Sequence, residues 1–175
     1  MKRMFSILLL LLALNIQSFA QKATKIWVVR HGEKETSDPK NLDPALTAIG
    51  NQRANALKAL LSKEKISYIF STPYNRTKQT ALPTANNRLV EVQTYNGANS
   101  NAFAEKIKAL PAGKNILIVA HSNTVLPIVK ALGAETDLKN LSEDDYDFIF
   151  ELRIKGEKVK LKVHRYGASN HTTEI

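Results

Sequence analysis

The sequence predicts an α/β fold, with a mainly parallel central sheet, helices on both of its faces and a C-terminal antiparallel hairpin at one edge. Three observations lead to this prediction. From Thr24 onward, short apolar runs alternate with amphipathic segments, as in strands joined by crossover helices. The strongest of these runs are apolar throughout, which is typical of strands covered on both faces. The last two strand-like runs are joined by 155–158, Lys-Gly-Glu-Lys, a composition that favours a hairpin turn.

Each element of the first half has a local signal. A strand is predicted at 25–30, where Ile-Trp-Val-Val is apolar throughout. After a polar loop, Thr47 is expected to cap a helix. The apolar residues of that helix recur at helical spacing, at Ala54, Leu57, Leu60 and Leu61. A second strand is predicted at 66–71. Pro73 is expected in the first turn of the following helix, where a missing N–H is tolerated, and that helix is expected to end near Thr84.

The second half continues the alternation. Its predicted elements are a strand at 88–95, a helix at 100–110, a strand at 115–120, a helix at 122–132, and strands at 146–154 and 159–166. Pro111 and Gly113 end the third helix, and Gly133 ends the fourth. The acidic run 143–145 predicts the first turn of a short helix, with one of its carboxyl groups open to a role as proton donor. Without an internal repeat or a linker, residues 21–175 are expected to form a single domain.

The composition excludes several classes of protein. The 175-residue chain has 43% hydrophobic and 23% charged residues, which excludes global disorder. It has no cysteine, so disulfides, a thiolate nucleophile and cysteine-built zinc or iron–sulfur sites are excluded. The net charge is +9, but the basic residues are spread along the chain, and their densest cluster, 155–162, alternates with apolar residues like an exposed strand face. We therefore expect no nucleic-acid partner and a basic surface that favours anionic substrates.

The first twenty residues have the three parts of a secretory signal peptide. Lys2 and Arg3 form a positive start, 7–14 is an unbroken apolar run, and small residues precede the expected cleavage after Ala20. The apolar run is short for a membrane span, which needs about 20 residues. An uncleaved anchor is the alternative. Cleavage leaves 155 residues with a charge of +7, and the mature protein is expected to be periplasmic or extracellular, with no stable membrane anchor.

Polar residues follow three of the predicted strands. The first strand ends in Arg30 and His31, the second leads into the segment that carries Arg76, and the most apolar strand is followed by His121. Ligands of parallel α/β sheets bind beyond the carboxyl ends of the strands, so we expect these four residues to lie together. The helix beginning at Ser122 adds backbone N–H donors and the positive end of a helix dipole.

This combination of side chains suits phosphoryl transfer. A phosphate monoester carries a strong negative charge that its transition state spreads over three oxygens, so catalysis is mainly positioning and electrostatic stabilisation. A guanidinium binds two such oxygens at once and stays charged. A neutral imidazole can attack phosphorus to give a covalent intermediate that water hydrolyses, and a second, cationic histidine can stabilise an oxygen.

Four motifs in these regions resemble the histidine phosphatase superfamily, also called phosphoglycerate-mutase-like. Arg-His-Gly-Glu stands at 30–33, Leu-Thr-x-x-Gly at 46–50, Ser-Thr-Pro-Tyr-Asn-Arg-Thr with a following Gln-Thr-Ala at 71–81, and Ala-His-Ser at 120–122. They occur in the family order and span about two thirds of the mature chain. The His-Ser pair resembles the branch of phosphoglycerate mutases and small phosphatases rather than that of acid phosphatases and phytases.

The resemblance implies a phosphatase that uses no metal and no organic cofactor. In this reading His31 is the phosphorylated nucleophile. Arg30 and Arg76 bind the phosphoryl oxygens, and His121 completes the pocket. The substrate implied is a phosphorylated small molecule or a phosphoprotein.

The sequence departs from the family pattern at the proton donor. Larger members supply a glutamate after the third strand, but 92–99 contains no acid, and Glu91 comes too early. Glu33 is the last residue of the Arg-His-Gly-Glu tetrad at 30–33, but membership of the tetrad does not require it to be catalytic. Ser122 and Asn123 are candidate substrate-binding residues, or only part of a helix cap. The chain also lacks the long insertions that cover the site in mutases, which favours a small, open phosphatase.

Five other residues receive structural interpretations. Trp27 is expected in the core, and His164 and His171 at the surface. Gln79 and Thr80 are expected to pack or to form local hydrogen bonds. The sequence predicts neither the oligomeric state nor the physiological substrate.

The main function expected is therefore an exported phosphatase acting on phosphomonoesters or phosphoproteins. A phosphoglycerate-type mutase is the first alternative, but a mutase must retain its phosphoenzyme in a closed site, and the short chain and the export signal argue against it. A non-catalytic phosphate-binding module with the same pocket is the second alternative. A metal site built from both histidines is disfavoured, because the neighbouring arginines repel a cation.

Overall fold

The computed structural model describes residues 22–173, so the predicted signal peptide lies outside the described residues. The strands are β1 (Thr24–Arg30), β2 (Ile66–Ser71), β3 (Val92–Thr94), β4 (Asn115–Ala120), β5 (Phe148–Lys155) and β6 (Lys158–Arg165). The helices are α2 (Ala48–Leu60), the 3₁₀-helix η2 (Leu61–Lys63), α3 (Asn75–Arg88), α4 (Ser100–Lys108) and α5 (Ser122–Ala131). No helix within 22–173 is long and apolar enough to span a membrane.

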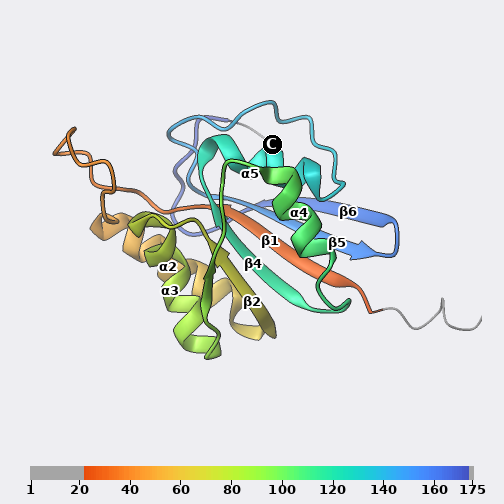
Figure 1. Ribbon diagram of the computed structural model, residues 1–175. Coiled ribbons are helices and arrows are strands. Elements are labelled where there is room, and N and C mark those ends of the chain that lie inside the picture. Colours follow the sequence, from red (N-terminus) through yellow and green to blue (C-terminus); the bar gives the residue numbers. More distant parts are fainter. Residues whose placement is uncertain (1–21, 174–175) are drawn as a thin grey trace, which may run out of the picture.

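The strands of this region form one six-stranded sheet in the order β3-β2-β4-β1-β5-β6 (Figure 1). β2 is parallel to both β3 and β4, and β4 is parallel to β1. β5 runs antiparallel to β1 and to β6, and the β5–β6 hairpin closes at Gly156 and Glu157. The predicted fold class is therefore confirmed, including the antiparallel hairpin at one edge.

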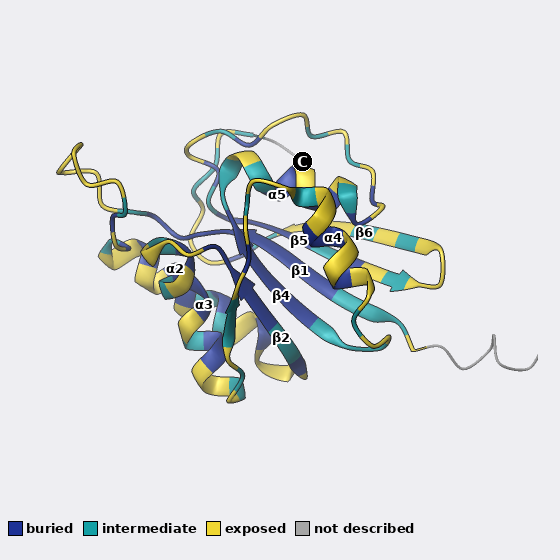
Figure 2. Cartoon of the chain, viewed as in Figure 1, coloured by how far each residue is buried: buried dark blue, intermediate teal, exposed yellow. Residues whose placement is uncertain are grey.

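Helices cover both faces of the sheet because the central strands alternate their side chains between two cores. Ile26 and Val28 of β1 belong to the core that includes residues of α4 and α5. Trp27 and Val29 belong to the core that includes residues of α2 and α3, so the core position predicted for Trp27 is confirmed. Figure 2 shows the central strands buried and the outward faces of the helices exposed. Each large apolar side chain buried in this way contributes about 1.5–3 kcal/mol.

Helix α3 differs from its prediction at both ends. Pro73 precedes the N-cap residue, Tyr74, instead of lying in the first turn. The helix continues through Pro83 to Arg88 and ends at Leu89, whose φ of 53° is left-handed. Pro83 removes one helical hydrogen bond. The neighbouring turn is nevertheless held by burial, because Ala81, Thr84 and Ala85 all pack inside the protein.

The acidic run 143–145 does not begin a helix, so that prediction is wrong. Residues 142–147, here called the arginine loop, contain only a turn at 143–144 and lead into β5. Asp145 and Asp147 are fully buried, which a solvated helix start would not allow. His164 is exposed as predicted, whereas His171 is partly buried and bonds Asp147, so its predicted surface position is wrong.

Candidate active site

The four residues predicted to lie together line one open cavity of about 870 Å³ at the carboxyl ends of β1, β2 and β4. Arg30 ends β1, and the next residue, His31, extends the pairing with β4 through a 3.0 Å hydrogen bond from its backbone N–H to the Ala120 carbonyl. His121 directly follows β4, and Arg76 stands in the first turn of α3 after β2. β4 lies between β1 and β2 in the sheet, so the three strand ends are adjacent.

The His31 side chain is held as a neutral imidazole. Its Nδ1 lies 2.7 Å from the Gly32 carbonyl oxygen, which can only accept, so Nδ1 carries the proton and Nε2 keeps a free lone pair. Burial, with the nearby charges of Arg30 and Arg76, lowers the pKa of His31 from 6.5 to about 3. The imidazole is therefore uncharged at neutral pH.

Two glycines let the segment 30–33, here called the tetrad loop, pass directly against the start of α2. A Cβ at Gly50 would lie 2.2 Å from the Glu33 carbonyl oxygen, and one at Gly32 would lie 2.8 Å from the Gly50 carbonyl oxygen. Thr80 accepts a hydrogen bond from the Gly32 N–H, and Gln79 accepts one from the Leu46 N–H. Thr80 also forms the local hydrogen bond predicted for it, by donating to the Arg76 carbonyl at 2.7 Å. The bonds from Gly32 and Leu46 instead span 48 and 33 positions and hold the loop beside His31.

Arg30 is almost completely buried and is held by the arginine loop. Its Nη1 donates to the backbone carbonyls of Ser142 and Glu143 at 2.9 and 2.8 Å, and its Nη2 donates to the Glu143 carboxylate at 2.9 Å. The Tyr146 ring lies 3.9 Å from the guanidinium carbon, a cation–π contact. Among the described residues, no group hydrogen-bonds its buried Nε.

Arg76 is held more loosely than Arg30. Its guanidinium lies 4.4 Å from the centre of the Tyr74 ring, and Asp43 approaches Nη1 only to 3.7 Å. Its Nε and Nη1 are buried without a hydrogen-bond partner in the described part of the chain. Buried N–H groups of a cation are normally hydrogen-bonded, so these unpaired donors in a cavity suit an oxyanion ligand.

His121 is the N-cap residue of α5, and its backbone N–H donates to the Thr124 hydroxyl. Its Nε2 lies 2.8 Å from the Thr72 hydroxyl, which also contacts the Thr77 hydroxyl at 2.9 Å. Burial and the charges of Arg76 and Arg30 lower the pKa of His121 to about 4. In the free site it is thus neutral at pH 7.

The structure selects among the carboxyl groups considered as proton donors. Glu33 forms a buried ion pair with Arg53, whose Nη2 lies 2.7 Å from Oε1, and so it stabilises the tetrad loop. Asp145 is fully buried, and Glu91 precedes β3 at the opposite end of that strand from the cavity. Glu143 alone among the cavity-lining residues of the described chain carries a carboxyl group.

Glu143 also explains the position of Ser122. The Ser122 hydroxyl donates to Oε1 of Glu143 at 2.9 Å, while the other carboxylate oxygen accepts from Arg30. Partial burial raises the pKa of Glu143, but the bond from Ser122 and the charge of Arg30 outweigh it and the pKa is lowered. Ser122 and Asn123 both line the cavity, as their predicted substrate role requires.

Sequence reasoning missed Arg53, Thr72 and the two tyrosines that contact the arginines, and it did not single out Glu143 from the acidic run 143–145. Thr72 and Tyr74 lie inside a motif that was recognised, so their sequence signal was present. Glu143 had only a weak signal, because it lies 113 residues from Arg30. Within residues 22–173 no group of three or more His, Asp or Glu side chains is arranged to hold a metal ion.

Residues 26–99 match the sequence profile of the histidine phosphatase superfamily (branch 1). The match covers 74 of the 175 residues. The matched segment contains the first three of the four motifs, and the fourth, at His121, lies beyond it and joins them in the cavity. No curated protein matches the sequence significantly.

Solved structures share the fold at low sequence identity. Protein histidine phosphatase SixA in complex with tungstate is 15% identical, with 81% of this chain and 96% of that chain covered and a TM-score of 0.67. A mycobacterial glucosyl-3-phosphoglycerate phosphatase, Rv2419c, is 15% identical, with 85% and 100% covered and a TM-score of 0.64. The same mycobacterial protein in complex with VO3 has a TM-score of 0.60, at 15% identity with 83% and 99% covered. At these identities the likeness establishes the fold.

Proposed function

We propose that this chain belongs to the histidine phosphatase superfamily and is a phosphatase that hydrolyses phosphomonoesters or phosphoproteins through a phosphohistidine on His31. The observation that carries the proposal is the pairing, in one cavity, of a neutral imidazole with two arginines that have buried, unpartnered N–H groups. Such donors suit the equatorial oxygens of a transferring phosphoryl group. The similar structures with tungstate and VO3, both oxyanions, support the same interpretation.

The proposed reaction has two steps. In the first, the Nε2 lone pair of His31 attacks phosphorus, the bond from phosphorus to the leaving group breaks, and that group departs with the bonding electrons. In the second, water attacks the phosphohistidine, the phosphorus–nitrogen bond breaks, and inorganic phosphate is released with His31 neutral again. A bound dianion raises the pKa of His121, so that this histidine takes up a proton and donates to a phosphoryl oxygen.

The proton supply decides which substrates react fastest. Glu143 has the one carboxyl group among the described cavity-lining residues, and its lowered pKa keeps that group ionised. The free site therefore offers no carboxylic acid that could protonate a departing alkoxide. A positioned general acid contributes about 10²–10⁴-fold. Aryl phosphates and phosphohistidine, which have good leaving groups, are therefore proposed to react much faster than simple alkyl phosphates. A flat dependence on leaving-group pKa would contradict this.

Phosphoenzyme trapping tests the proposal. The purified protein is incubated with a radiolabelled aryl phosphate and quenched in alkali; we expect a label on the protein that is lost in acid, as for phosphohistidine. His31→Ala should abolish both labelling and turnover. His164→Ala, which removes an exposed histidine on β6, is the matched control and should leave both unchanged. Binding without labelling or turnover would instead support a phosphate-binding module.

Two further assays separate the remaining alternatives. With 3-phosphoglycerate as substrate, free phosphate is expected, whereas an isomeric phosphoglycerate would identify a mutase. We also propose that no metal takes part, because the two arginines beside the histidines repel cations. Turnover should then survive treatment with a strong chelator, and a loss restored by added metal would overturn this point.

Export is a separate proposal, supported by the sequence of residues 1–20. The protein recovered outside the cytoplasm should begin at Gln21. Recovery of the intact chain in the cytoplasm, starting at Met1, would overturn it. The readout is cell fractionation followed by N-terminal sequencing.

A further inference from the structure

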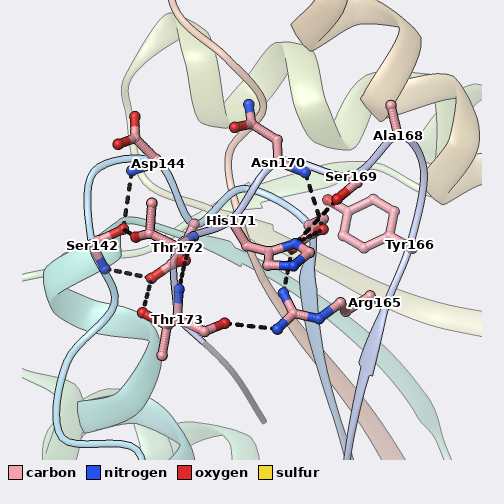
Figure 3. A network of polar contacts seen from close by, with 12 residues as sticks. Ser142, Asp144, Arg165, Tyr166, Ala168, Ser169, Asn170, His171, Thr172 and Thr173 are labelled. Atoms are coloured by element: carbon pink, nitrogen blue, oxygen red, sulfur yellow. Dashed lines mark hydrogen bonds and ion pairs between the residues drawn. The ribbon is translucent and has the colours of Figure 1, made fainter.

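The segment after β6 returns across the arginine loop. Residues 166–173, here called the tail, form a dense polar network with that loop (Figure 3). Asp145 of the loop accepts hydrogen bonds from the backbone N–H groups of Thr172 and Thr173, both at 3.0 Å, and from the Thr173 hydroxyl at 2.6 Å. Its remaining bond, at 2.6 Å, comes from the N–H of Ser142 in the loop itself.

Asp147 makes a second set of contacts with the same tail. It accepts from the Asn170 N–H at 3.1 Å and lies 2.6 Å from His171 Nδ1. Between the two aspartates, the Tyr146 N–H is shared between the Asn170 carbonyl of the tail and the Asp144 carbonyl of the loop, both at 3.0 Å. Both aspartates are fully buried, and the tail supplies most of the donors that offset the loss of water around Asp145.

The opposite side of the loop holds Arg30. Four groups of the loop contact this guanidinium: the carbonyls of Ser142 and Glu143, the Glu143 carboxylate and the Tyr146 ring. The loop contains no helix or strand that could fix its shape. Apart from hydrogen bonds within the loop, most of the contacts that support it on the side away from Arg30 come from the tail.

The tail also reaches the tetrad loop. The Asn170 side-chain amide donates to Glu33 Oε1 at 2.9 Å. Arg53, which pairs with Glu33, donates in turn to the carbonyls of Tyr166 and Ala168 at 2.9 and 3.0 Å. Two of the chain segments that form the cavity thus share the tail as a support, although no tail residue lines the cavity.

We propose that the tail is a positioning element and that Asp145, through its tail contacts, is a positioning residue that presents Arg30 to the bound phosphoryl group. This inference rests on the proposed function in that Arg30 must bind an oxyanion. Burial raises the pKa of Asp145, but its hydrogen bonds from Thr173, Thr172 and Ser142 outweigh this and lower it well below the usual range. Loss of the tail leaves this carboxylate buried and short of donors, so the loop must open to hydrate it.

A double-mutant cycle on tungstate binding tests the inference. One variant ends at Ala168, which keeps the carbonyls bound by Arg53 and the bond from the Tyr166 N–H to the Asp147 carbonyl. It removes residues 170–173, which supply the tail's contacts with the Asp145 carboxylate and the bonds of Asn170 and His171 to Asp147. It should remain folded and lose at least about tenfold in tungstate affinity, the scale of one charge-assisted hydrogen bond. In an Arg30→Lys background the truncation should change the affinity by less than about twofold. In an Arg76→Lys background the full loss should persist, because Arg76 is held by Asp43 and Tyr74.

A point variant covers the case in which the truncated chain does not fold. Asp145→Asn replaces one acceptor oxygen with a donor facing the tail N–H groups, and it should reproduce the loss. Asp144→Asn removes the exposed neighbouring charge and is the matched control. The peptide Ser-Asn-His-Thr-Thr-Glu-Ile, residues 169–175, should restore affinity when added to the truncated protein. Equal losses in all three backgrounds, or no loss, would overturn the inference.

Hydrogen exchange separates this inference from the proposed function. In the truncated protein, the amide of Tyr146 should exchange much faster than in the full chain, whereas amides of β2 should not. If the full-length protein bound no tungstate and trapped no phosphate, the proposed function would fail. Unchanged exchange at Tyr146 would by itself overturn the positioning role.

Discussion

The ionisation of His31 leads to a prediction about activity in acid. Burial, with the charges of Arg30 and Arg76, lowers its pKa to about 3, so at pH 5 about 99% of His31 is expected to be neutral. An unperturbed histidine would be only about 3% neutral at that pH. If the neutral imidazole is the nucleophile, kcat/KM at pH 5 should stay within about twofold of its value at pH 7, instead of falling roughly 25-fold.

The assay measures kcat/KM because this quantity reports the ionisation of the free enzyme. The substrate is an aryl phosphate with a strongly electron-withdrawing group, and its own second ionisation is divided out of the profile. His31→Ala gives the background rate at each pH. A decline with an inflection near pH 6.5 would refute the reasoning, because it would show that the cavity does not exclude the charged imidazole.

The same shift links His31 to folding stability. Between pH 6.5 and pH 3 the unfolded chain binds a proton that folded His31 does not, so stability falls as the pH is lowered through this window. From pH 7 to pH 5 the loss attributable to His31 is about 2 kcal/mol. Urea denaturation should therefore show His31→Ala gaining stability relative to the parent protein over this range. If the difference in free energy of unfolding between the two proteins is the same at pH 7 and at pH 5, the lowered pKa is contradicted.

Substitutions at three positions test other contacts. Arg76→Ala should lower kcat/KM by about two powers of ten, on the order of 3 kcal/mol. Arg76→Lys should restore little of this loss, because lysine lacks the planar fork of a guanidinium. If steady-state kinetics show the lysine variant to be as active as the parent protein, direct binding of the phosphoryl group by Arg76 is excluded. Gly50→Ala places a Cβ 2.2 Å from the Glu33 carbonyl oxygen, so both the unfolding midpoint and turnover should fall, and an unperturbed melt would contradict the close approach. Glu143→Gln removes a negative charge that competes with the bound anion for Arg30. Tungstate should therefore bind about fivefold more tightly, on the order of 1 kcal/mol. Weaker binding in a calorimetric titration would show that Glu143 acts mainly by holding Arg30.

Much of the site followed from the order of local signals. Arg30 and His31 end one strand, His121 follows another, and Arg76 begins the helix after a third. The carboxyl ends of parallel strands share one edge of a sheet, so recognising the strands was enough to place these side chains together. The same local patterns located β2 and β4 with their observed bounds, because each is a continuous apolar run between polar segments.

The sequence by itself therefore determined the fold class, the edge of the sheet that carries the cavity and the four side chains gathered there. Only the tertiary structure decided that Asp145 and Asp147 are buried, that Glu143 binds Arg30 and that the tail holds the arginine loop. These contacts join residues up to 113 positions apart within the described chain. A run of acidic residues has the same local sequence pattern whether its hydrogen bonds come from water or from a distant tail, so the pattern alone does not distinguish the two. Local propensity favoured a helix start at 143–145. The buried carboxylates instead accept hydrogen bonds from tail residues that come close to them only when the chain folds.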